Sequence, residues 1–258
     1  MQISRIVAGP ARERRRIVQR NSPKHSASRQ ISNDLKDSTS LLRSAWGATR
    51  PINAGVAGDS LWNVSRRSLT TERLILRRWR ASDRAPFRSM NADPRVMEFM
   101  PRLLTSEESD RLLERIEGHF EQHGFGLFAA EVRESGLFAG FVGLAVPEFT
   151  APFTPCVEIG WRLACEYWGK GLATEGAREV LRYAFEDIGM AQVVSFTVPA
   201  NVRSRRVMER LGMVRDLHGD FDHPMLPEGD PLRPHVLYRI ERKAWESSRA
   251  TVNGPSAT

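Results

Sequence analysis

The feature that most constrains the fold is the stretch from residue 157 to Gly189, where three types of local pattern follow one another. Residues 157–163 alternate in polarity, as is typical of a strand. Residues 168–175 form a glycine-bearing loop, and apolar residues at helical spacing then continue to Gly189. The stretch therefore predicts a strand, a tight loop and a helix. Such an arrangement brings unpaired backbone N–H groups and the positive end of a helix dipole to one point, which favours phosphate binding.

The two glycines of this loop, Gly169 and Gly171, permit a tight turn and leave space for a ligand beside the backbone. Lys170 adds a positive charge at the same place. The loop lacks the G-x-x-x-x-G-K-[ST] pattern, and it lacks the third glycine of the dinucleotide fingerprint. Taken alone, it fits either a phosphate seat or a strand-to-helix turn with no ligand.

Further motifs occur in an order that resembles the GCN5-related N-acetyltransferase (GNAT) superfamily. They are Glu158-Ile159-Gly160-Trp161, residues 168–175, Asn201-x-x-Ser204 and Leu211-Gly212-Met213. Within the superfamily, the opening residues 69–77 and Asp93-Pro94-x-Val96 resemble the branch that contains the ribosomal-protein N-terminal acetyltransferases. The resemblance covers residues 69–245.

This resemblance implies one α/β domain, which we place at residues 68–246. Its expected sheet is mixed and mainly antiparallel, with flanking helices and a splayed central pair of strands. Local patterns add a strand at 74–79, a helix after the capping signal at 105–108, a hairpin at 127–133 and 137–146, and a strand at 193–198. A short helix at 202–211, a strand near Met213, a Pro/Gly-rich excursion at 219–234 and a strand at 236–240 complete the domain.

The net charge of +7 is unevenly distributed. Residues 1–67 hold 13 Lys and Arg against 4 Asp and Glu, whereas the remaining residues hold 25 against 27. The basic character therefore belongs to an N-terminal extension, which we expect to be disordered. It fits a solvated or upstream-translated extension, an organelle transit peptide or a polyanion-binding arm. A second disordered tail is expected at 247–258.

Composition narrows the class of protein. The 258 residues are 41% hydrophobic, which suffices for a core, and no apolar run approaches the about 20 residues that span a bilayer. Cys156 and Cys165 form neither a disulfide framework nor a metal-ligand cluster. We therefore expect a cytoplasmic, metal-free protein without membrane contact, as a monomer or homodimer.

Glu158 is the candidate general base. In an alternating strand it lies on the face opposite to Ile159 and Trp161, together with Arg162. A carboxylate in mid-strand loses hydration free energy unless it is paired or functional. The sequence leaves both options open, namely a salt bridge to Arg162 or a role in accepting a proton from an amine.

The resemblance implies acetyl-CoA as the donor and direct attack by a primary amine, without an acyl-enzyme. It implies that Asn201 hydrogen-bonds the pantetheine arm and that Ser204 protonates the departing sulfur. Trp168 stands where the superfamily often has Gln or Arg, and we interpret it as a packing residue. The residues expected to bind the cofactor are Leu163, Trp168, Gly169, Lys170, Gly171, Leu172, Ala173, Thr174, Asn201 and Ser204. The neighbouring Arg203, Arg205 and Arg206 fit either a solvated face or phosphate contacts.

The acceptor is less constrained, and a protein N-terminus and a small-molecule amine both fit. Candidate positions for its site are His123, Phe125, the loop 147–155, and the excursion with Asp220, Asp222, His223 and His235. The main alternative is a CoA-binding sensor or interaction module without turnover. Nucleic acid binding is expected only through residues 1–67.

Overall fold

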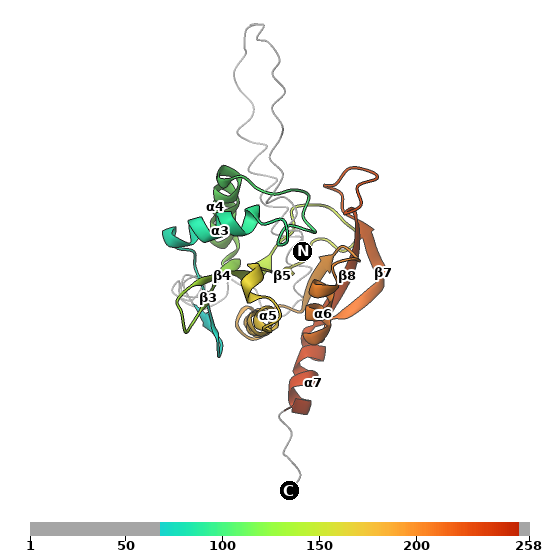
Figure 1. Cartoon of the computed structure of the whole chain (residues 1–258). Coiled ribbons are helices and arrows are strands. Elements are labelled where there is room, and N and C mark those ends of the chain that lie inside the picture. Colours follow the sequence, from blue (N-terminus) through green and yellow to red (C-terminus); the bar gives the residue numbers. More distant parts are fainter. Residues whose placement is uncertain (1–67, 253–258) are drawn as a thin grey trace, which may run out of the picture.

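The computed structural model describes residues 68–252 (Figure 1). The predicted extension over 1–67 and the end of the predicted tail, 253–258, lie outside the described residues. The described chain forms one eight-stranded sheet in the order β1-β2-β3-β4-β5-β6-β8-β7. Its strands are β1 (Leu69–Thr70), β2 (Leu74–Arg77), β3 (Leu127–Val132), β4 (Phe138–Ala145), β5 (Glu158–Leu163), β6 (Gln192–Thr197), β7 (Val214–Asp222) and β8 (Pro234–Glu241).

The helical elements pack around this sheet. The α-helices are α3 (Arg84–Ala92), α4 (Ser106–His123), α5 (Leu172–Arg182), α6 (Val202–Arg210) and α7 (Arg242–Val252). Short 3-10 turns η1 (Ala81–Asp83) and η2 (Cys165–Tyr167) precede α3 and α5, and the π-helical segment η3 (Tyr183–Ile188) extends α5. The predicted capping box at the start of α4 is confirmed, because Thr105 and Glu108 cap one another's backbone N–H groups.

The strands pair antiparallel except for β5 and β6, which are parallel and share one registered pair, Glu158 opposite Val194. Beyond it, Ser195 Oγ donates to the Ile159 carbonyl at 3.0 Å, so a side chain takes the place of a ladder hydrogen bond. The strands therefore diverge towards Leu163. The prediction of a mixed, mainly antiparallel sheet with a splayed central pair is confirmed.

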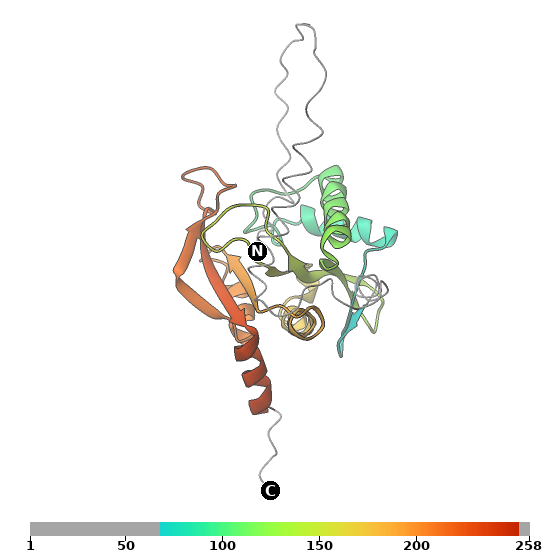
Figure 2. The ribbon, with the colours of Figure 1, turned by 180° about the vertical axis from the view of Figure 1, so that it is seen from behind.

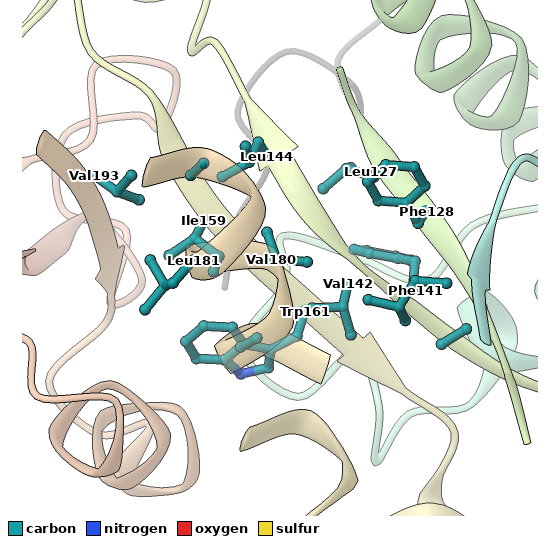
Figure 3. Close-up of a cluster of buried hydrophobic side chains, with 14 of the residues drawn as sticks. Leu127, Phe128, Phe141, Val142, Leu144, Ile159, Trp161, Val180, Leu181 and Val193 are labelled. Carbon is teal, nitrogen blue, oxygen red and sulfur yellow. The ribbon is translucent and has the colours of Figure 1, made fainter. Parts of the chain in front are cut away.

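Helix α5 covers one face of the sheet, while α3 and α4 lie on the other (Figures 1 and 3). Figure 3 shows Val180 and Leu181 of α5 against the strand residues Val142 and Ile159, and all four are buried. The side chains that alternate with these point the other way. Phe141 of β4 packs against Phe87 of α3, with ring centroids 6.3 Å apart.

The long helix ends at Gly189 as expected but differs in its winding, and two element boundaries differ from the expectation. The long helix winds as a π-helix over its last residues before Gly189 closes it in the left-handed conformation. Strand β7 continues to Asp222, into the predicted excursion, because it pairs with β8 again after a bulge between Asp216 and Phe221. Helix α7 continues past residue 246, the expected end of the domain, and extends away from the sheet (Figure 2).

Candidate active site

A cavity of about 360 Å³ opens where β5 and β6 diverge. Its walls come from the end of β5, the glycine loop with the first turn of α5, the helix α6, and the segment 95–100. All of the residues expected to bind the cofactor line it except Lys170. Those that line it are Leu163, Trp168, Gly169, Gly171, Leu172, Ala173, Thr174, Asn201 and Ser204.

The glycine loop has the geometry that the sequence predicts. Gly169 and Gly171 both have positive φ angles, 72° and 79°, which the absence of a Cβ makes accessible. Gly171 precedes α5 without any side-chain cap, so the first-turn N–H groups, which lack intrahelical partners, face the cavity. Trp168 donates its indole N–H to the Leu163 carbonyl at 2.8 Å, in keeping with its expected packing role. Lys170 is exposed, with its ammonium over the Tyr167 ring.

The glycine loop is anchored to the β1–β2 turn through Glu175. The Glu175 carboxylate accepts from Thr71 Oγ1, from the Arg73 backbone N–H at 2.8 Å and from Arg73 Nε at 2.7 Å. Arg73 also donates to the Lys170 carbonyl at 2.9 Å. The opening motif of the domain therefore has a physical role, which is to fix the loop. Sequence reasoning missed this contact, since the partners are about a hundred residues apart.

Glu175→Ala should therefore loosen the loop. We expect a loss of about 1–2 kcal/mol of unfolding free energy and a several-fold weaker acetyl-CoA affinity, because the loop N–H groups lose their fixed direction. Thermal unfolding and a cofactor titration measure the two effects. Glu179→Ala is the matched control, because Glu179 pairs with Arg182 on the same helix away from the cavity. An equal loss of affinity in both variants would contradict the anchoring role.

Helix α6 supplies two of the predicted site residues. Asn201 Oδ1 accepts from the Ser204 backbone N–H at 3.2 Å, which caps the helix as expected. Asn201 Nδ2 donates to Thr197 Oγ1 at 3.1 Å. Asn201 and Ser204 are both buried, and both line the cavity beside the end of β5.

Five arginines line the cavity, namely Arg162 of β5 together with Arg95, Arg203, Arg206 and Arg210. Arg203 lies over the Trp168 ring at 4.6 Å and pairs with Glu98. Arg205 turns away and donates to the Pro199 carbonyl at 3.1 Å. Sequence reasoning did not single out Arg95 or Arg210. Helical spacing could have indicated Arg210, because it lies four residues after Arg206 on the same helix face.

Glu158 lies at the opposite end of β5 from the glycine loop and is 1% exposed. Within the described chain, its Oε1 has no hydrogen-bond partner. Burial raises the pKa of the Glu158 carboxyl well above its usual range. The alternative salt bridge to Arg162 is absent among the described ion pairs, because Arg162 Nη1 donates to Asn91 Oδ1 at 2.8 Å. Glu158 is not among the described residues that line the cavity.

The candidate acceptor residues fall in two places. His123 and Phe125 lie at the end of α4, with ring centroids 5.8 Å apart. His223 and His235 are buried 5.1 Å from one another, beside an aromatic cluster that the 147–155 loop joins through Phe149 and Phe153. Asp220 and Asp222 pair with Arg215 and Arg233.

Among residues 68–252, no group of three or more His, Cys, Asp or Glu side chains is arranged to hold a metal ion. None of the helices in this range is long and apolar enough to cross a membrane.

Comparison with known proteins decides the family. The sequence profile of the acetyltransferase (GNAT) domain matches residues 73–214, more than half of the chain. The chain belongs to the GNAT acetyltransferase family. The superfamily resemblance noted in the sequence is confirmed, and the protein is an acetyltransferase of the class that uses acetyl-CoA as co-substrate.

Individual relatives of this GNAT protein are similar over different spans. The Aspergillus fumigatus FsC-acetyl coenzyme A-N(2)-transacetylase is 38% identical over 130 residues, which cover 47% of this chain and 52% of the relative. The Bacillus subtilis N-acetyltransferase YnaD is 25% identical over 69% of this chain and 98% of its own length. The crystal structure of the Vibrio fischeri ribosomal-protein-S5-alanine acetyltransferase has the same fold, with a TM-score of 0.54 at 20% identity over 69% of this chain and 98% of that one.

Proposed function

We propose that this GNAT protein transfers the acetyl group of acetyl-CoA to a primary amine by direct attack. The observation that carries the proposal is the cavity at the end of β5, beyond the point where β5 and β6 stop pairing, with the first turn of α5 at its mouth. The acceptor class comprises a protein N-terminus and a small-molecule amine.

The residues around the cavity fit acetyl-CoA. The N–H groups of the loop and of the first turn of α5 are donors for a diphosphate, and Arg203, Arg206 and Arg210 supply positive charge beside it. Asn201 and the end of β5 would then border the pantetheine arm. When bound, the co-substrate supplies a thioester whose thiolate leaves readily, so positioning provides much of the rate acceleration.

Within this arrangement Glu158 accepts the proton that the attacking amine must lose. A free amine is mostly protonated at neutral pH, since the pKa of a lysine-like group is about 10.4. Burial raises the pKa of the Glu158 carboxyl well above its usual range, which makes it a stronger proton acceptor than an exposed carboxylate. Glu158 is not among the described residues that line the cavity, so the proton reaches its Oε1 through water. The Ser204 hydroxyl donates a proton to the departing sulfur.

An acyl-enzyme on Cys156, two residues before Glu158, is disfavoured because this thiol is protonated at neutral pH. Burial, with a further contribution from the Glu158 charge, raises the pKa of the Cys156 thiol to about 12. A thiol with that pKa is almost entirely protonated at neutral pH and is a poor nucleophile.

The test is thiol release from acetyl-CoA by the full chain, over peptides that begin with Ala or Ser and over small primary amines. The panel has both arms because one relative is named for a ribosomal protein and another for an N(2) position. We expect release that depends on the amine and an acetylated product of matching mass. Tight acetyl-CoA binding without release for every amine would instead identify a binding module.

A further inference from the structure

Among the ion pairs of residues 68–252, the buried Arg162 has no carboxylate partner. It lines the cavity from β5 and is 6% exposed. Its described contacts are neutral, with Nη1 donating to Asn91 Oδ1 at 2.8 Å and Nη2 lying 3.0 Å from Met100 Sδ. Its Nε–H is buried and has no hydrogen-bond partner among the described residues.

A second buried arginine, Arg77, shows how a structural arginine is paired in this protein. Arg77 is 7% exposed and forms ion pairs with Asp83 and Glu131, both at 2.7 Å. Hydrogen bonding to Asp83 is the main reason that the pKa of the Arg77 guanidinium is raised. At Arg162, by contrast, burial alone lowers the pKa of the guanidinium to about 10, so it remains charged at neutral pH.

A buried charge without a counter-ion is unfavourable unless a ligand supplies one. Asn91, Met100 and the Phe141 ring, 5.3 Å below the guanidinium, fix the direction of the Arg162 side chain. A guanidinium held in this way presents its donors in the planar geometry that matches a carboxylate.

The position of Arg162 separates it from the phosphate seat. Arg162 lies opposite Phe141 in the β4–β5 register, and it therefore points to the α3 face of the sheet. Helix α5, whose first turn forms the phosphate seat, covers the other face through Val142 and Ile159 (Figure 3). Glu158 shares the face of Arg162, four residues or roughly 13 Å away along the strand.

We propose that Arg162 recognises an anionic group of the acceptor, so that the preferred acceptor amines carry a carboxylate. Its role is specificity, with the amine directed towards Glu158 and the carboxylate held by the guanidinium. Asn91 is the positioning residue that orients the guanidinium. This inference rests on the proposed acyl transfer. Its test can reject the role of Arg162 while acyl transfer itself is still observed.

The test uses matched acceptors that differ in charge alone. Linear ω-amino carboxylates of graded length are compared with their carboxamides, because a methylene chain keeps the basicity of the two amines alike. With the full chain, we expect a higher kcat/KM for the carboxylate at the best length, and Arg162→Gln should lower the carboxylate-to-amide ratio by about 10- to 100-fold. Arg162→Lys should keep part of the preference, since it keeps the charge and loses the planar donor geometry.

Two controls separate specificity from packing. The amide acceptor is an internal control, because its kcat/KM with Arg162→Gln should change little if the variant is folded. Arg77→Gln should lower thermal stability without changing the ratio, and Asn91→Ala should lower the ratio mainly through KM for the carboxylate.

Two results would overturn the inference. The first is the absence of a carboxylate preference at every chain length, or an equal carboxylate-to-amide ratio for wild type and Arg162→Gln. In that case, turnover of the amides would still support the proposed acyl transfer. The other is a fall in acetyl-CoA affinity of Arg162→Gln without a change in the ratio, which would assign the guanidinium to a phosphate of the co-substrate.

Discussion

Glu158→Gln is expected to lower kcat by about 10²- to 10⁴-fold while acetyl-CoA affinity stays nearly unchanged, which is the effect of removing a general base. The variant keeps the size of the side chain and cannot accept the proton. It also keeps the cavity wall intact, because Glu158 is not among the described residues that line it. Steady-state kinetics with a saturating amine and a separate co-substrate titration measure the two quantities.

The same substitution has a pH-dependent effect on stability with a defined sign. Burial raises the pKa of Glu158 in the folded state above its unfolded value, so the folded state holds the proton more tightly. The contribution of this one group to folding is therefore fully present at acidic pH, below its unfolded pKa, and it is lost as the pH rises through the folded pKa. The Glu158→Gln variant has no carboxyl group to titrate at this position and so avoids this loss of stability. It should therefore unfold at a higher temperature than the wild type at neutral pH.

The matched control is Glu131→Gln. Glu131 is another buried carboxylate, but it pairs with Arg77 and Arg80 at 2.7 and 2.9 Å. Breaking these pairs should lower the unfolding temperature and leave kcat per folded molecule unchanged. A Glu158→Gln variant with wild-type kcat across pH 6–9 would show that this carboxylate is not the base.

Gly171→Val is expected to weaken acetyl-CoA binding by about 10-fold or more. Gly171 has a φ angle of 79°, which costs a β-branched residue on the order of 1–3 kcal/mol. A Cβ there would meet only Arg73 Nη2, at 3.6 Å, so backbone strain and the side chain at the cavity mouth dominate over clashes inside the protein. Isothermal titration with acetyl-CoA measures the change.

Gly136→Val provides the comparison for strain alone. Gly136 also has a positive φ angle, 67°, in the turn between β3 and β4, and a Cβ there would meet nothing within 4 Å. Both valine variants should lose stability, and only Gly171→Val should lose affinity. Equal affinities for the two would mean that the loop backbone does not hold the co-substrate.

Much of the fold follows from patterns that are short in the sequence. Gly169 and Gly171 predict a loop with positive φ angles, Thr105 and Glu108 predict a helix cap, and Asn201 predicts the start of α6. Each of these features depends on residues within one turn of one another. Their geometry therefore depends mainly on neighbouring residue types, which the sequence shows directly.

The ends of the strands were less predictable, because strand pairing depends on residues that are distant in the sequence. Strand β7 passes through the Gly219 region to Asp222, although glycines and charges there favour a loop. Its pairing with β8 resumes after a bulge, and such pairing depends on a partner strand distant from the turn signals.

By itself, then, the sequence determined the order of the elements and the loop that faces the cavity, because backbone conformation responds to neighbouring residue types. Only the tertiary structure decided the burial of Glu158 and the partners of Arg162 and Glu175. Arg162 contacts Asn91 from another element, and Glu175 contacts Arg73 across the domain. Sheet register and helix layering bring such groups together, and the burial that follows determines their charge and their chemistry.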